Sequence, residues 1–144
     1  MNDPLSKAFA TLDKLDLAQI QSTGEWELGR MCSHLAQGVV FSMEGDPIQK
    51  PRLFQATAGT VAFKLFTMRG RMSHGLDEPI PGEVVASVTA DEGLGRLWAS
   101  LEAFRDFEGP LQPHFAYGAL RKDQFGNAHL LHIENHLQEV GPRG

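Results

Sequence analysis

Residues 122–140, KDQFGNAHLLHIENHLQEV, form the stretch on which the interpretation of this chain turns. They contain three histidines, His129, His132 and His136, spaced by three and four residues. Such spacing places side chains on one face of an α-helix. Gly141 and Pro142 follow directly, and this pair is typical of a helix end. We therefore predict a helix over residues 122–140 with its histidines on a single face.

The same periodicity predicts four helices upstream of this one. Three of them begin at helix-start signals, namely Asp3 with Pro4, Ser22 with Glu25, and Thr89 with Glu92. The predicted helices cover residues 4–15, 22–44, 54–69 and 89–104. Glycine and proline residues separate them, and strand patterns are weak, because the valines at 84, 85 and 88 alternate poorly.

Five helical segments predict an all-α fold. The expected arrangement is an antiparallel four-helix bundle with one additional shorter helix and long connecting loops. The sequence leaves open which helix is the shorter one. At 144 residues the whole chain, 1–144, is expected to form one domain. The connection GRMSHGLDEPIPGEVVASVTA, residues 70–90, is long for a compact domain and is therefore expected to cover a site, with His74 as a solvated loop residue.

Composition excludes several classes of function. The net charge of -5 provides no basic surface for nucleic acid. No apolar run reaches spanning length and no signal peptide is recognised, so a cytoplasmic protein of bacterial type without a membrane partner is expected. The single cysteine, Cys32, excludes an internal disulfide and is expected in the core. A small-molecule substrate remains as the expected partner, and a homodimer stays open.

His132 and His136 lie one helical turn apart, a spacing that lets two imidazoles bind one cation. A third ligand must come from another helix, and His34 in the second predicted helix is the best candidate, with Gly38 leaving room beside it. Three neutral imidazoles with an open position are typical of a catalytic zinc-type site, while nickel, copper and iron also accept imidazole. From spacing alone, a hydrogen-bonded histidine cluster in the core remains the alternative.

Two stretches carry a resemblance to a known family. Residues 114–141, HFAYGALRKDQFGNAHLLHIENHLQEVG, and residues 25–37, EWELGRMCSHLAQ, resemble the DinB/YfiT-like metalloenzyme superfamily. They are most similar to a branch known only as a domain of unknown function, which has a His-Pro-x-Phe-Gly-x-Leu element, then His-x-x-x-His, and a Trp-Gly…His-Leu segment upstream. The departures are Phe115 in place of proline, Asn135 in place of a second histidine, and Glu139 in place of glutamine.

The resemblance implies a DinB-like bundle with a divalent metal, zinc or nickel, at His34, His132 and His136. It also implies a metal-dependent enzyme of hydrolase or thiol-dependent transferase type acting on a small molecule. Two further residues are candidates for catalysis: His114 as a proton donor at the site mouth, and Glu139 as a general base or a ligand-orienting group. The alternative is a non-catalytic helical module in which the histidines form a structural or vestigial polar cluster. Tyr117 is a candidate, with His114, to close the mouth of the site. His129 is expected to pack at the rim, with a hydrogen bond to a ligand as the alternative, and Gln37 either lines the cavity or lies at the surface.

Overall fold

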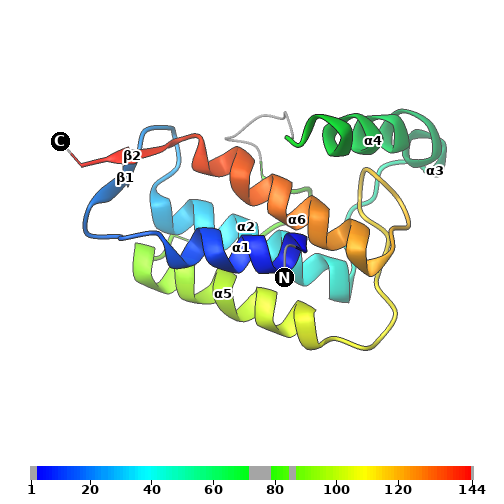
Figure 1. Cartoon of the computed structure of the whole chain (residues 1–144). Helices are drawn as coiled ribbons and strands as arrows, with labels where there is room; N and C mark the ends of the chain where they lie inside the picture. Colours follow the sequence, from blue (N-terminus) through cyan, green and yellow to red (C-terminus); the bar gives the residue numbers. More distant parts are fainter. Residues whose placement is uncertain (1–2, 72–78, 85–86, 144) are drawn as a thin grey trace.

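A computed structural model describes residues 3–71, 79–84 and 87–143, and within them the chain is mostly helical, as predicted (Figure 1). The helices are α1 (Pro4–Asp13), α2 (Leu28–Glu44), α3 (Arg52–Phe54), the π-helical turn η1 (Gln55–Gly59), α4 (Thr60–Arg69), α5 (Ala90–Asp106) and α6 (Lys122–Leu137). Two short strands, β1 (Ile20–Ser22) and β2 (Val140–Pro142), pair in antiparallel fashion. Among the described residues, no helix is both long and apolar enough to cross a bilayer.

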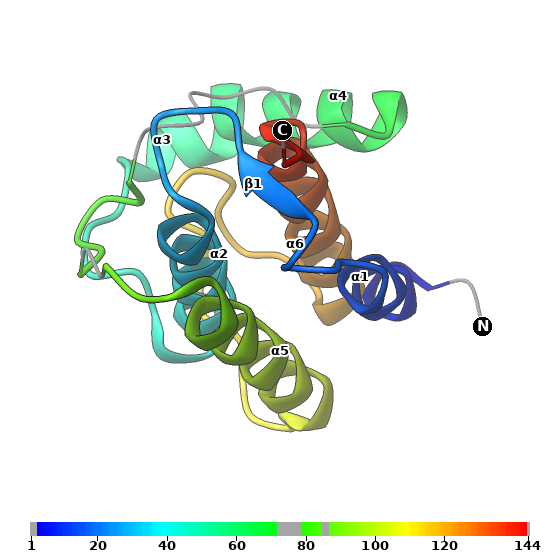
Figure 2. The ribbon, with the colours of Figure 1, turned by 90° about the vertical axis from the view of Figure 1, so that its left-hand side faces the viewer.

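The core lies between α1, α2, α5 and α6, which pack side by side (Figure 2). Each of these helices turns an apolar stripe inward, because its large apolar residues recur at intervals of three and four. The inward side chains that are almost completely buried include Leu12, Leu35, Leu97, Leu101, Phe104, Phe125 and Ile133. Cys32 is buried among them, as predicted, and burial raises the pKa of its thiol to about 11.

The direction of the helices differs in part from the predicted antiparallel arrangement. α2 and α5 begin at the same end, where Gly29 touches the backbone of Val88 and Thr89 too closely for a Cβ atom. α1 and α6 finish at the same end, where β1 pairs with β2 (Figure 1). Within each of these pairs the helices are parallel. The long connection between α2 and α5 makes this feasible, because it returns the chain to the end where α2 began.

Helix starts agree with the sequence where a side chain caps the helix. Asp3 accepts a hydrogen bond from the backbone N–H of Ser6, and Thr89 accepts one from Glu92, each at 3.1 Å. The predicted start at Ser22 is wrong, because Ser22 pairs with Val140 in the small sheet and α2 begins at Leu28. The same pairing ends α6 at Leu137, before the predicted residue 140.

The peripheral helix is the one predicted over residues 54–69. α3, η1 and α4 follow one another without a break from residue 52 to residue 69, and this outer helix lies beside the core (Figure 1). Gly59 allows it to approach the backbone of Ala116, since a side chain at that position would collide with the Ala116 carbonyl. The long connection that follows is described at residues 70–71, 79–84 and 87–89, and His74 lies outside the described residues.

Candidate metal centre

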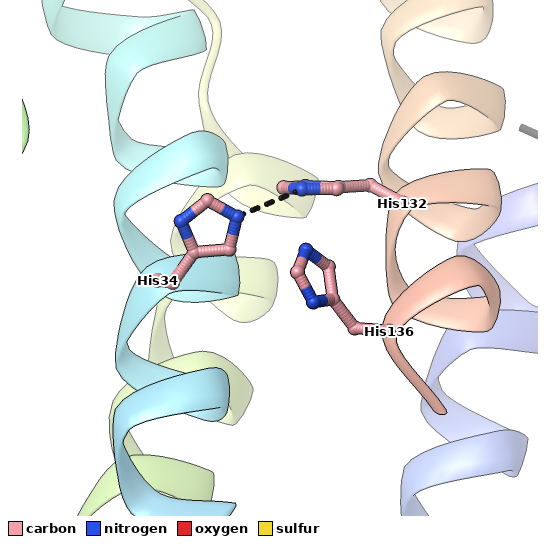
Figure 3. Close-up of side chains that lie close together, drawn as sticks. All are labelled: His34, His132 and His136. Carbon is pink, nitrogen blue, oxygen red and sulfur yellow. Dashed lines mark hydrogen bonds between the residues drawn. The ribbon is translucent and has the colours of Figure 1, made fainter. Parts of the chain in front are cut away.

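The three histidines predicted as ligands face one another between two helices (Figure 3). His34 projects from α2, and His132 and His136 project from successive turns of α6. His34 and His136 are completely buried, while His132 is partly exposed. The spacing of His132 and His136 therefore places both rings on one face of α6, as predicted. The packing of α2 against α6 brings the third ring, that of His34, beside them.

The ring nitrogens enclose a small space. Nε2 of His34 lies 3.0 Å from Nε2 of His132. One nitrogen from each of the three rings falls within 4.8 Å of the others, an arrangement that can hold a metal ion. Nitrogens around a tetrahedral zinc ion are about 3.3 Å apart, given Zn–N bonds of about 2.0–2.1 Å. The imidazoles would have to rotate toward one another to reach that spacing at every pair.

A buried carboxylate fixes the orientation of the first histidine. Nδ1 of His34 donates to Glu83 Oε1 at 2.6 Å, and the backbone N–H of Ile80 donates to the same oxygen at 3.0 Å. Arg30 binds the other oxygen, Oε2, at 2.5 Å. Because Nδ1 holds the proton, the lone pair of His34 lies on Nε2, which faces the other two rings.

Electrostatics keep Glu83 ionised although its side chain is fully buried. Burial alone raises the pKa of this carboxyl, but the hydrogen bonds from His34 and Arg30 outweigh it and lower the pKa below its usual value. A buried carboxylate held in this way both orients an imidazole and increases its basicity toward a cation. Glu83 therefore fixes the orientation of the His34 ring.

Trp26 packs against two of the three rings of the cluster. Its ring stacks on His136 at 5.8 Å between centroids and meets His34 edge-on at 4.8 Å. The Arg30 guanidinium lies 4.0 Å from the Trp26 ring centre, so it connects the tryptophan to Glu83. The sequence did not predict roles for Glu83 or Arg30. The one available signal was that Glu83 lies in the connection expected to cover a site.

A cavity of about 300 Å³ opens beside the histidines. His34 and His132 border it, and Gly38 contributes space, because a Cβ there would lie 3.4 Å from both the His132 ring and Ile80. Its remaining wall is mainly apolar and aromatic, with a few polar groups. The other lining residues are Ser42, Asp46, Lys50, Pro79, Ile80, Pro81, His114, Phe115, Ala116, Tyr117, Phe125, Ala128 and His129.

Comparison with known proteins places the chain in a family. The family model described as "Protein of unknown function (DUF1569)" matches residues 2–143. The chain belongs to the DUF1569 family. A search of curated proteins found no match, and a search of solved structures found none either. This match agrees with the resemblance to a branch of unknown function. The description of the family names no activity.

His114 of this DUF1569 chain lines the cavity. Its protonation state differs from that expected of a proton donor. Its Nδ1 accepts hydrogen bonds from the backbone N–H groups of Ala116 and Tyr117, each at 3.1 Å. Burial, with a smaller contribution from His129, lowers its pKa to about 3. The ring is therefore neutral near pH 7 and holds its proton on Nε2. His114 is suited to donating a hydrogen bond and is not suited to releasing a proton.

Glu139 and Gln37 lie outside the cavity wall. Glu139 follows the end of α6, its backbone carbonyl accepts from Thr23 at 2.8 Å, and its side chain lies against Gly24. Because α6 stops at Leu137, the helical face that carries His132 and His136 does not extend to Glu139. Tyr117 and His129 do line the cavity, and Tyr117 stacks on His114 at 4.1 Å.

Buried His129 should make the stability of this DUF1569 chain depend on pH. It bonds to Ser42 at 3.2 Å and packs between Phe104 and Phe125, and burial lowers its pKa to about 3. Below the ordinary histidine pKa of about 6.5, the unfolded chain binds a proton that the folded chain does not. The contribution of His129 to stability is therefore complete above about pH 6.5 and falls as the pH drops, by roughly 2 kcal/mol at about pH 5. His114, whose pKa is also lowered to about 3, adds a loss of similar size that remains in a His129 variant.

Urea unfolding with a chelator present, at about pH 7.5 and about pH 5, measures this loss without a contribution from metal release. The variant His129→Gln keeps a donor for Ser42 but does not titrate, so its stability should change less between the two pH values. Equal pH dependence of the variant and the original chain would show that His129 is not the group responsible.

Proposed function

We propose that this DUF1569 chain binds a divalent metal ion through His34, His132 and His136 and acts as a metal-dependent enzyme on a small molecule. The observation that carries the proposal is the meeting of three imidazoles from two helices, with ligand atoms within 4.8 Å of one another. The set of three nitrogen donors suits zinc or nickel. The resemblance to the DinB/YfiT-like superfamily supports the same assignment. In that comparison, α1, α2, α5 and α6 of this chain would form the four-helix core.

Each part of the site would have a separate task. The three histidines would hold the ion, Glu83 would orient His34, and Trp26 would exclude water from the buried side. A metal held by three neutral ligands retains an open position and acidifies a water or thiol bound there. This chemistry is shared by hydrolases and thiol-dependent transferases, the two reaction types proposed.

The cavity suggests what the substrate resembles. Its interior histidines, His114 and His129, are both neutral near pH 7, because burial lowers each pKa to about 3. Its wall is largely apolar, with Phe125 and Ile80 among the lining residues. A small molecule with an apolar part and an oxygen that accepts from Nε2–H of His114 fits these surroundings.

The alternative is a non-catalytic module in which the histidines bond to one another. The 3.0 Å contact between His34 and His132 favours it, because two imidazoles at this distance form a hydrogen bond without an ion. Thermal unfolding separates the two proposals. Zinc at one hundred times its dissociation constant adds about 2.7 kcal/mol to stability, so the melting temperature should rise by roughly 5 to 10 °C over chelated protein. An identical melting temperature with zinc, nickel and chelator favours the module.

A further inference from the structure

The outer helix, residues 52–69, exposes large apolar side chains. The exposed fraction is 64% for Val61, 46% for Leu65 and 85% for Met68. These three residues are four and three positions apart, so they lie along one face of α4. Leu53 and Phe54, at 76% and 38% exposure, extend the apolar surface to the start of the helix.

The opposite face of the same helix accounts for its attachment to the core. Phe63 is buried against Tyr117, with ring centroids 5.3 Å apart, and Phe66 also meets Tyr117. Gly59 lies against the backbone of Ala116. Packing therefore uses one face only, and the exposed apolar face contributes nothing to the core. Apolar surface of this kind on an outer helix usually marks a contact site.

The segment around this face is positively charged, whereas the chain as a whole is negatively charged. Residues 47–71 include five of the 13 basic residues and none of the 18 acidic ones, although the whole chain has a net charge of -5. All five basic side chains are exposed, and they are Lys50, Arg52, Lys64, Arg69 and Arg71. A partner that combines negative charge with apolar groups would complement this face. An apolar helical face bordered by lysine and arginine is typical of helices that lie in the surface of a bilayer.

We propose that the outer helix docks on an anionic phospholipid surface. Val61, Leu65 and Met68 would enter the boundary between headgroups and acyl chains, and the basic residues would meet lipid phosphates. A second copy of the chain fits less well, because joining two such faces would oppose two basic helices. The sequence expectation of no membrane partner rested on the lack of a spanning run, and a helix lying in the surface needs none.

Docking in this way places the cavity next to the lipid. The segment that packs on the inner face of the outer helix, residues 114–118, also supplies four of the residues that line the cavity: His114, Phe115, Ala116 and Tyr117. The proposal does not depend on metal binding, because no residue of the histidine cluster belongs to the outer helix.

Co-sedimentation with vesicles tests the proposal on the full chain. Vesicles of equal parts phosphatidylcholine and phosphatidylglycerol should bind the protein, those of phosphatidylcholine alone should not, and added salt should release it. The double variant Lys64→Glu, Arg71→Glu should weaken binding by about tenfold or more. The matched control, Lys7→Glu with Lys14→Glu on the α1 side, makes the same change in net charge and should bind like the original chain.

A second variant, Leu65→Glu with Met68→Glu, changes exposed positions and should leave the helical circular dichroism intact while reducing vesicle binding. Absence of binding to the anionic vesicles overturns the proposal, as does equal loss in the control variant. If light scattering shows a dimer that this variant dissociates, and vesicles do not bind, the face is an interface between two copies and the lipid proposal is wrong.

Discussion

Replacing His132 with alanine is expected to abolish tight metal binding while the fold survives. His132 supplies one of three ligand nitrogens within the cluster, and its side chain is partly exposed beside a cavity. Its removal therefore leaves two imidazoles for the ion and little lost packing. Isothermal titration with zinc, together with far-ultraviolet circular dichroism, measures both properties on the same sample.

The control for this variant is His129→Gln, which alters a histidine one turn earlier on α6. His129 bonds to Ser42 and is not one of the cluster nitrogens, so zinc binding per folded molecule should be unchanged. If His132→Ala binds zinc as tightly as the original chain, His132 is not a ligand. If it unfolds the protein while the original chain binds no metal, the histidine is a hydrogen-bonding core residue.

Replacing Leu101 with alanine is expected to have the opposite effect, a loss of stability with the site retained. Leu101 lies inside α5 and is completely buried. Truncating a buried leucine removes apolar contacts and leaves a cavity, which costs about 2–5 kcal/mol. The free energy of unfolding in urea measures this loss, and zinc titration of the folded fraction should match that of the original chain.

Leu53→Ala is the matched control, since it makes the same chemical change at a leucine that is 76% exposed. Its effect should stay within about 0.5 kcal/mol. A similar small effect for Leu101→Ala would contradict the placement of α5 in the core.

Local sequence patterns predicted the parts of this protein that depend on neighbours in the chain. The spacing of His132 and His136 is a property of one helix, and the caps at Asp3 and Thr89 need only the following turn. His34 needed more, because no local rule joins α2 to α6. His34 was the best candidate from its place on the second predicted helix, the family resemblance supported it, and the structure brings its ring to the other two.

The features that the sequence did not predict depend on residues far apart in the chain. β1 and β2 are three residues each and pair across most of the chain length, so neither has a recognisable alternation. Glu83 bonds to His34 from a separate connection, and only the folded chain shows its role. The shared direction of α2 and α5 arises from the long segment between them, which returns the chain to the end where α2 began, and the predicted antiparallel arrangement did not include this return.

X-ray absorption at the zinc or nickel edge is the measurement that tests the proposed metal centre most directly. The metal-loaded chain should contain one ion per molecule, with three imidazole nitrogens at about 2.0–2.1 Å, and His132→Ala should lose that spectrum. A chain that retains no zinc or nickel after loading and desalting, or an ion whose spectrum shows no imidazole, would contradict the assignment of His34, His132 and His136 as its ligands.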